Sequence, residues 1–314
     1  MSFWIDLGRR LTLMTINIMA YKDCGGCGPE VGPSCVNAFA RRGIRALHWE
    51  CWSACNLSCP FCYRTHSDPV TGVDARRLVN IVSTSGARSL VFAGGDPSLR
   101  PDLPELCRLA KESGLNVEIQ TNAHSRLPTI ISALSFCDSI AVSIDAPVSF
   151  QHDEIRGARG NFRKVMSLIG KAEALDIPVR VRSVITNVVA EDWRLLGREI
   201  SRHENVIEWR IQELSAVGQG LWVHSGLSVP SSHITRLAES LADEFPRLNC
   251  SYVSSASKVG LYAMARSDGQ LYGTQGKLDS TGHYALAGNL LREHLCTLAS
   301  DLGIDIPRHS ARYA

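Results

Sequence analysis

Three cysteines, Cys55, Cys59 and Cys62, lie close together at the spacing C-x3-C-x2-C. Their thiolates are soft ligands of the kind that binds iron–sulfur clusters, zinc or copper(I). Three thiolates from one short loop can hold three irons of a [4Fe–4S] cluster and leave the fourth iron open to a reactant. A structural zinc site would need a fourth ligand, for which His66 is the nearby candidate. The spacing therefore predicts a metal centre and favours a cluster with one open iron over zinc.

A second group of cysteines, Cys24, Cys27 and Cys35, precedes this loop in a turn-rich segment at the spacing C-x2-C-x7-C. A C-x2-C pair is a common ligand spacing. The sequence identifies no fourth ligand, although Cys51 or a substrate atom could serve. Two interpretations follow: an auxiliary iron–sulfur cluster, or a leader whose cysteines are merely near one another.

Composition restricts the class of protein. The net charge is only +2 over 314 residues, with both signs interspersed, and this gives no case for a nucleic-acid polymer or a membrane as partner. The eleven cysteines are an odd number, and four lie between Cys51 and Cys62, which favours metal-bound thiolates in a reducing compartment over a disulfide framework. The first twenty residues lack the apolar core of a signal peptide. We expect a cytoplasmic protein without a membrane partner.

From residue 46 the sequence repeats a pattern of strand, loop and helix. We expect strands at 46–52, 89–93, 116–121, 139–144, 179–185 and 207–214, with helices at 75–83, 103–110, 128–134, 162–169 and 193–200. Six such units in a row predict a parallel sheet with right-handed crossovers. Because there are six units rather than eight, the predicted fold is an α/β partial (β/α)6 barrel of the TIM type, open on one side.

The pattern changes after the sixth strand. We expect a helix through 234–245, a hairpin of 261–266 and 270–273 across an Asp-Gly turn, a last helix at 290–301 and a loose tail, Pro307–Ala314. The expected organisation is an N-terminal extension (1–45), the barrel core (46–215) and a small C-terminal α+β extension (216–314).

The loop after the second strand contains Gly94-Gly95-Asp96-Pro97. Active sites of parallel barrels lie at the C-terminal ends of the strands, so this loop and the cysteine loop should share one face. Two glycines allow the backbone to approach a ligand closely. The Asp96 carboxylate can accept a hydrogen bond from an ammonium group.

Alternation along the strands predicts a polar interior, because the outward side chains must be apolar to pack on helices. The side chains expected to face inward are Glu118, Gln120, Asn122, Ser143, Asp145, Arg180, Arg182, Glu208, Arg210 and Gln212. Such pairs could simply neutralise one another, as buried charges must. A full ring of them favours a ligand cavity. Because Glu208 can neutralise only one arginine, we expect Arg180 and Arg210 to meet an anionic substrate.

The C-x3-C-x2-C loop, with the aromatic Phe61 before its last cysteine and Gly94-Gly95-Asp96-Pro97 one unit later, resembles the radical S-adenosylmethionine (SAM) enzymes. The resemblance covers roughly residues 45–215, and Asp96 stands where these enzymes have glutamate. It implies a [4Fe–4S] cluster on Cys55, Cys59 and Cys62, SAM on the open iron, an electron donor of the flavodoxin or ferredoxin type, and hydrogen abstraction by a 5′-deoxyadenosyl radical. The residues that it places against SAM are Phe61, Gly94, Gly95, Asp96, Asn122, Ser143, Arg156 and Arg182.

Within that superfamily, Val181–Trp193 and Glu208–Gln212 resemble the viperin-like and molybdenum-cofactor cyclase-like enzymes, which act on nucleoside triphosphates. The resemblance implies an anionic small-molecule substrate of nucleotide or sugar-nucleoside type, used in cofactor or natural-product biosynthesis, with Arg180, Arg210 and Gln212 as contacts. The predicted hairpin also resembles the start of the twin-cluster extension of peptide-modifying radical SAM enzymes, but only Cys296 follows it. A peptide-modifying enzyme and a non-catalytic iron–sulfur or zinc protein remain as alternatives.

Overall fold

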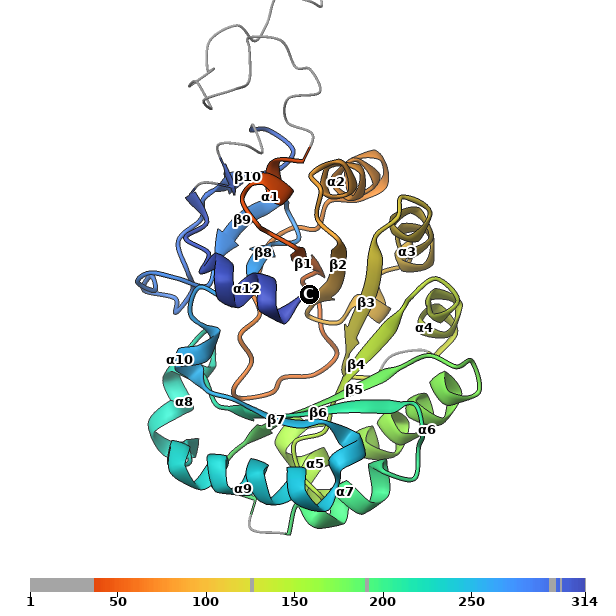
Figure 1. Cartoon of the computed structure of the whole chain (residues 1–314), viewed down its shortest axis with the longest axis vertical. Coiled ribbons are helices and arrows are strands. Elements are labelled where there is room, and N and C mark those ends of the chain that lie inside the picture. Colours follow the sequence, from red (N-terminus) through yellow and green to blue (C-terminus); the bar gives the residue numbers. More distant parts are fainter. Residues whose placement is uncertain (1–36, 125–126, 190–191, 294–297, 300, 314) are drawn as a thin grey trace, which may run out of the picture.

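The computed structural model describes residues 37–313 except 125–126, 190–191, 294–297 and 300 (Figure 1). The expected auxiliary site of Cys24, Cys27 and Cys35 lies outside the described residues, as does part of the helix expected at 290–301. No helix in the described part of the chain is both long enough and apolar enough to cross a membrane.

A ten-stranded sheet forms the framework of the molecule. Its parallel strands follow the chain order β1 (Ala46–Trp52), β2 (Ser89–Gly94), β3 (Asn116–Thr121), β4 (Ser139–Ser143), β5 (Val179–Ile185), β6 (Val206–Glu213) and β7 (Cys250–Val253). The six expected strands and the partial-barrel fold are confirmed. β7 is an additional parallel strand beside β6, and its short sequence, Cys-Ser-Tyr-Val, does not show the alternation that would have predicted it.

Three further strands extend the sheet on the other side of β1. They are β8 (Ala263–Ala265), which is parallel to β1, and β9 (Gln270–Gly273) and β10 (Gly288–Asn289), which are antiparallel to their neighbours. The expected hairpin is therefore present as β8 and β9. The segment after residue 215 does not form a separate sheet, because β7 and β8 flank the core strands on both edges.

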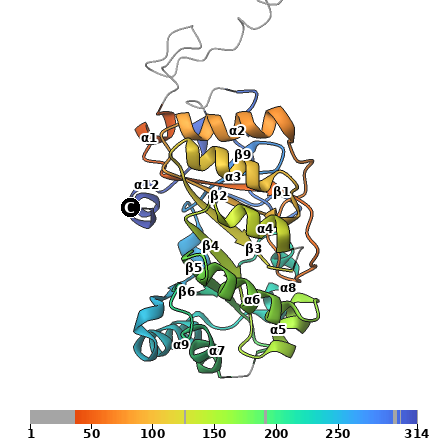
Figure 2. The same ribbon diagram turned by 90° about the vertical axis from the view of Figure 1, so that its right-hand side faces the viewer.

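Helices cover the outside of the curved sheet (Figures 1 and 2). They are α2 (Gly72–Thr84), α3 (Leu103–Glu112), α4 (Leu127–Leu134), α5 (Ser149–Arg156), α6 (Asn161–Glu173), α7 (Arg194–Ile200) and α9 (Ser231–Glu244). Their apolar faces and the outward side chains of the strands form one core, and β5 alternates buried and half-buried residues along its length. The sequence did not reveal α5 because it has no apolar stripe; its buried residues are His152 and Arg156.

A short connection, residues 254–262, joins β7 to β8 and contains the one-turn helix α10 (Ser255–Lys258). β7 is parallel to β6 and β8 is parallel to β1, so the two strands have the same direction. The connection must therefore run from the C-terminal end of β7 to the N-terminal end of β8. In Figure 1, α10 lies between these two strands, on the side where a six-unit barrel would be open.

The last described residues are not the loose tail that the sequence suggested. Ile306–Arg312 form helix α12, which overlaps the ring of strands in Figure 1 and lies at one end of the strands in Figure 2. The buried His309 accepts hydrogen bonds at Nε2 from the backbone N–H groups of Arg45 (2.8 Å) and Ala46 (3.3 Å), and its Nδ1 donates to the carbonyl of Leu261 (2.7 Å). These bonds dock α12 at the N-terminal end of β1.

Candidate active site

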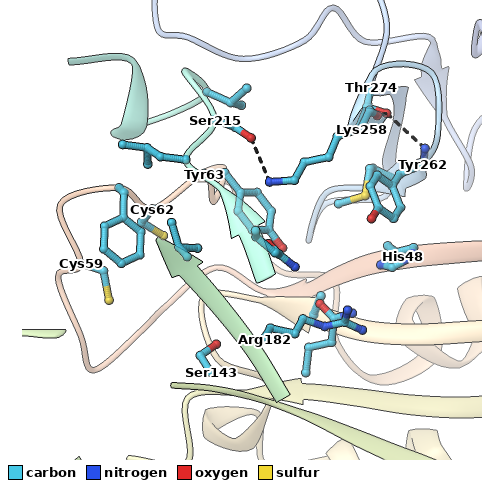
Figure 3. A pocket seen from close by; sticks show the side chains of 18 of the residues that line it. His48, Cys59, Cys62, Tyr63, Ser143, Arg182, Ser215, Lys258, Tyr262 and Thr274 are labelled. Carbon is cyan, nitrogen blue, oxygen red and sulfur yellow. Dashed lines mark hydrogen bonds between the residues drawn. The ribbon is translucent and has the colours of Figure 1, made fainter. Parts of the chain in front are cut away.

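A cavity of about 590 Å³ lies inside the barrel (Figure 3). Pockets of this size bind small molecules and cofactors. Most of the residues predicted for the site line it: Cys55, Cys59, Phe61, Cys62, Gly94, Gly95, Asn122, Ser143, Arg156, Arg182 and Gln212. Three predicted residues, Asp96, Arg180 and Arg210, are not part of its lining.

The three cysteines lie on a loop after β1, here called the cluster loop (Cys55–Cys62). Two of its sulfurs receive hydrogen bonds from outside the loop: Asn122 Nδ2 donates to Cys55 Sγ (3.3 Å), and Arg156 Nη1 donates to Cys59 Sγ (3.5 Å). Such donors, one of them cationic, are suited to electron-rich thiolate sulfurs. Within the described ranges, no group of three His, Cys, Asp or Glu side chains converges so as to hold a metal ion. In a cluster each cysteine binds a different iron, and three thiols facing one cavity fit that donor set.

Two thiols of the cluster loop, those of Cys55 and Cys62, are protonated when no metal is bound. Burial raises the pKa of Cys62 to about 11 and also raises the pKa of Cys55. Because metals bind the thiolate form, ligation of iron at this loop would release protons.

The two glycines after β2 hold this strand against the start of the cluster loop. A Cβ atom at Gly94 would lie 2.4 Å from the carbonyl oxygen of Trp52, and one at Gly95 would lie 2.2 Å from the carbonyl oxygen of Ala54. Gly95 N–H donates to Trp52 O (2.7 Å), which locks this approach. The glycines were expected to bring the backbone close to a ligand. They line the cavity, but the close approach that requires them is between two segments of the chain.

Asp96 lies behind the wall of the cavity and is fully buried. Its carboxylate accepts hydrogen bonds from Ser98 N–H (2.9 Å), Thr121 Oγ1 (2.9 Å) and Asn122 N–H (2.8 Å). The expected contact with the amino group of SAM therefore finds no support in the structure. Asp96 instead positions the backbone of Asn122, whose side chain reaches both the cavity and Cys55.

Arg156 connects the cluster loop to the strands beside it. Its guanidinium forms an ion pair with the buried Asp145 (2.5 Å) and lies 5.9 Å from the ring centroid of Phe61. Asp145 in turn accepts a hydrogen bond from the backbone N–H of Val184 on β5 (2.8 Å). The cluster loop, α5 and β5 are thus held in a fixed relation around the cavity.

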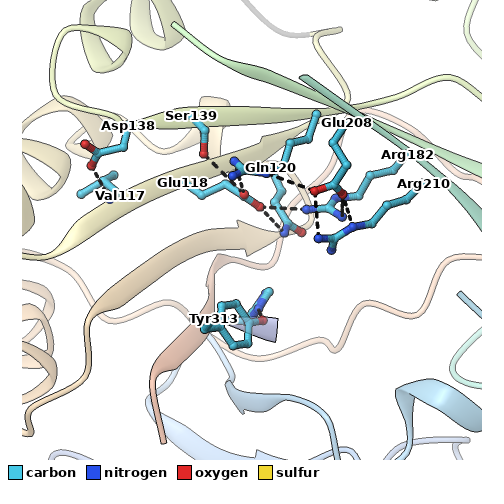
Figure 4. Close-up of polar contacts among 11 residues, drawn as sticks. Val117, Glu118, Gln120, Asp138, Ser139, Arg182, Glu208, Arg210 and Tyr313 are labelled. Carbon is cyan, nitrogen blue, oxygen red and sulfur yellow. Dashed lines mark hydrogen bonds and ion pairs between the residues drawn. The ribbon is translucent and has the colours of Figure 1, made fainter. Parts of the chain in front are cut away.

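A network of charges lies on the inner face of β3, β5 and β6 (Figure 4). Glu118 pairs with Arg180 (3.1 Å) and Arg182 (3.0 Å), and Glu208 binds Arg210 through Nη2 (3.0 Å). Burial alone would raise the pKa of Glu118, but Arg182 and Arg180 lower it to about 2. The alternation argument placed these side chains on one face correctly. The expectation that Arg180 and Arg210 lack partners was wrong, since both form ion pairs within the network.

The far side of the cavity comes from residues after β7, and sequence reasoning missed it. We call this part the C-terminal wall; it includes Lys258, Tyr262, Tyr272 and Arg312. Lys258 Nζ donates to Ser215 Oγ and to the carbonyl of Glu213, both at 3.0 Å (Figure 3). Burial lowers the pKa of this amine to about 8. No periodic pattern marks these residues, because they are spread over the one-turn helix α10, the turn after it, the short strand β9 and the polar helix α12.

His48 and Tyr313 meet where α12 reaches the barrel. His48 Nε2 and the Tyr313 hydroxyl are 2.5 Å apart, which is a hydrogen bond between the third residue of β1 and the last described residue. Burial lowers the pKa of His48 to about 3, so its imidazole is neutral at physiological pH. His48 also lines the cavity, which places this end of the molecule at the site.

The chain thus combines a partial barrel, three cysteines on the loop after its first strand, and a cavity of the size that binds small molecules. The model of the radical SAM superfamily matches residues 49–196. The chain belongs to this superfamily of enzymes.

Several known proteins are similar to this chain. An AdoMet-dependent heme synthase of Methanosarcina barkeri is 29% identical over 183 residues, which are 56% of this chain and 52% of that protein. An S-adenosylmethionine-dependent nucleotide dehydratase of Selenomonas ruminantium is 24% identical over 276 residues, 83% of this chain and 95% of that protein. The chain thus spans about half the length of the heme synthase and nearly the whole dehydratase.

The fold resembles the crystal structure of Streptococcus suis SuiB bound to its precursor peptide SuiA. The TM-score is 0.64 at 16% identity, and the match covers 88% of this chain and 69% of SuiB. At this identity the likeness shows a shared fold alone.

Proposed function

We propose that this chain is a radical SAM enzyme that binds a [4Fe–4S] cluster through Cys55, Cys59 and Cys62 and acts on an anionic small molecule. When bound, the cluster and SAM supply a 5′-deoxyadenosyl radical, which abstracts a hydrogen atom from the substrate. The observation that carries the proposal is the pair of donors, Asn122 and Arg156, directed at two sulfurs of one loop that faces a cavity.

The residues around the cluster loop are suited to hold SAM. Phe61 offers an aromatic face, Asn122 and Ser143 offer hydrogen-bonding groups, and all three line the cavity. Arg182 adds a positive charge that a carboxylate would meet, and we assign it to SAM as the sequence suggested. Gly94 and Gly95 shape the wall between these groups.

An anionic substrate is supported by the balance of charge around the cavity. Arg182, Lys258 and Arg312 line it, and Glu213 is the glutamate in its lining. We propose a substrate of nucleotide or sugar-nucleoside type in cofactor or natural-product biosynthesis, which agrees with the similarity to the Selenomonas dehydratase over most of the chain. The connection 254–262 and α12 limit access of water, which protects a reactive radical.

The test is anaerobic reconstitution of the wild-type protein and of Cys59→Ala. The wild type should bind about four irons at this loop and release 5′-deoxyadenosine from SAM with a chemical reductant or with a flavodoxin or ferredoxin, the donors expected in the cytoplasm. Cys59→Ala should do neither. Cys250→Ala, which removes a partly buried cysteine on β7, is the matched control and should behave as wild type. Full SAM cleavage by Cys59→Ala would refute the proposal.

A peptide-modifying activity is the second candidate, favoured by the likeness in fold to SuiB, whose crystal structure contains its precursor peptide. Incubation of the reconstituted protein with SAM and either nucleotides or short peptides distinguishes the two, because coupled turnover should increase 5′-deoxyadenosine release with the true substrate class. A wild-type protein that holds iron but never releases 5′-deoxyadenosine would be a non-catalytic iron–sulfur protein.

A further inference from the structure

Arg312, on the last turn of α12, carries a guanidinium that forms no ion pair among the described residues. Burial raises the pKa of Glu208, and the charge of Arg312, beyond ion-pair distance, is among those that oppose this shift. It lines the cavity and lies 5.1 Å from the ring centroid of Tyr262 and 5.8 Å from that of Tyr313. Its Nε is buried and has no hydrogen-bond partner. Among the residues that the structure describes, no carboxylate forms an ion pair with it, in contrast to Arg308 on the same helix, which pairs with Asp305. The rings of Tyr262 and Tyr313 thus hold the Arg312 guanidinium at the cavity, and no carboxylate among the described residues forms an ion pair with it.

Lys258 is a second cation without a carboxylate partner in the C-terminal wall. Both of its hydrogen bonds go to neutral oxygens, Ser215 Oγ and the Glu213 carbonyl, and an ammonium group has three donors. The Glu213 carboxylate is occupied elsewhere, by Ser231 Oγ (2.6 Å) and by the backbone N–H of Ser255 (2.6 Å). One donor of Lys258 is therefore left for a ligand.

Positive charges also outnumber negative charges when the C-terminal wall and the charge network of β3, β5 and β6 are counted together. The cations are Arg180, Arg182, Arg210, Lys258 and Arg312, whereas the carboxylates are Glu118, Glu208 and Glu213. Glu118 and Glu208 are shared among the three arginines of the strands. Arg312 and Lys258 are half-buried, and a bound anion would offset the cost of removing part of their charge from water.

We propose that Arg312 and Lys258, which line the same cavity, bind the phosphate groups of the substrate, so that the C-terminal wall fixes the anionic end of the molecule while its reacting part lies toward the cluster loop. A guanidinium and an ammonium group on one wall are suited to phosphate groups, since the guanidinium fork binds two oxygens and the amine adds a point charge. The inference rests on the proposed function for the identity of the ligand as substrate. The binding of phosphate itself needs neither iron nor SAM.

The experiment is isothermal titration calorimetry of the full chain with inorganic pyrophosphate, at about 0.1 M salt so that weak surface attraction is screened. Malonate is the carboxylate probe. The wild type should bind pyrophosphate more tightly than malonate. Arg312→Gln and Lys258→Met should each weaken pyrophosphate binding by roughly tenfold or more, and Arg312→Lys should lie between Arg312→Gln and the wild type. Arg292→Gln removes an exposed arginine and should keep the wild-type affinity.

Thermal unfolding of each variant establishes that a loss of binding is not a loss of folding, and Arg312→Lys keeps the test informative if Arg312→Gln proves unstable. Equal pyrophosphate affinity in the wild type and Arg312→Gln, or absence of binding to the wild type, would overturn the inference. Tighter binding of malonate would overturn the assignment to phosphate. A wild-type protein that binds pyrophosphate but never cleaves SAM would refute the proposed function and leave this anion site in place.

Discussion

The two sides of the cavity are built in different ways. The cluster loop and Gly94-Gly95 are contiguous motifs at the C-terminal ends of neighbouring strands, and Gly95 N–H donates to the carbonyl of Trp52, just before the cluster loop. The C-terminal wall comes from a short connection on the open side of the barrel, a hairpin beside β1 and a terminal helix docked at the N-terminal end of β1. The difference teaches that the half of the site with the superfamily's cysteine motif is determined locally, whereas the half that we propose for substrate binding is determined by long-range contacts.

The largest effect of a substitution is expected at Gly95, on the side of the cavity that carries the cluster loop. In Gly95→Ala the new Cβ would lie 2.2 Å from the carbonyl oxygen of Ala54, so the backbone at the start of the cluster loop must move. We expect a loss of about 3 kcal/mol in the free energy of unfolding and loss of most bound iron after reconstitution. Iron analysis and denaturant unfolding measure the two effects.

Gly226→Ala is the control for this variant, because a Cβ there would meet no atom within 4 Å. It should retain iron and stability. If Gly95→Ala binds iron as the wild type does, the locked approach of β2 to the cluster loop is not needed to form the site.

A smaller effect is expected at Asp96, which is buried behind the cavity wall and holds the backbone of Asn122 on the side of the cluster loop. In Asp96→Asn an amide N–H2 replaces one acceptor oxygen and faces donors such as the backbone N–H of Asn122. Leaving a buried donor unsatisfied should lower the free energy of unfolding by about 1–3 kcal/mol. Urea unfolding checks the loss, and a stability equal to that of the wild type would contradict the positioning role of Asp96.

On the opposite side, His309→Ala should loosen α12. The backbone N–H groups of Arg45 and Ala46 would lose their acceptor, at a cost of about 1–2 kcal/mol. Hydrogen exchange should show faster exchange in α12 and at the start of β1, with the cluster loop unchanged. The exposed His233 on α9 provides the control, since His233→Ala should change stability by less than about 0.5 kcal/mol. Unchanged exchange in α12 would contradict the docking role of His309.

The smallest effect is a dependence of stability on pH. Burial lowers the pKa of His48 to about 3 and also lowers the pKa of His309, so both are neutral in the folded protein. Below about pH 6.5 the unfolded chain binds protons that the folded chain does not, and stability should fall as the pH falls, by at most about 1.4 kcal/mol per pH unit for each group. Urea unfolding at pH 7.5 and 5.5 measures this slope, which should be smaller in His309→Ala. An equal slope in both proteins would show that His309 does not contribute.

The sequence predicted the six core strands and the cluster loop because their signals are local: alternation within a strand and spacing within a loop. It also placed Arg180, Arg182 and Glu208 on one face. Their pairing could not be predicted, because it depends on the register between β5 and β6, which shifts at Val179 and Arg180.

The terminal helix α12 was not predicted from the sequence for a related reason. Its sequence is polar, and the buried His309 is satisfied by backbone groups 264 residues away.

The docking of α12 under β1 also has a consequence for the order in which the protein is assembled. On the ribosome, residues 46–122 emerge early, and neighbouring parallel strands can pair as they leave the exit tunnel. β1 gains its second neighbour, β8, only after residue 265 has been made, and His309 reaches Arg45 later still. Contacts of such sequence separation form slowly. The nascent protein therefore has a period in which the cysteines are already in place on a partly folded sheet while the opposite wall does not yet exist, and a metal cluster could be inserted from that open side before synthesis is complete.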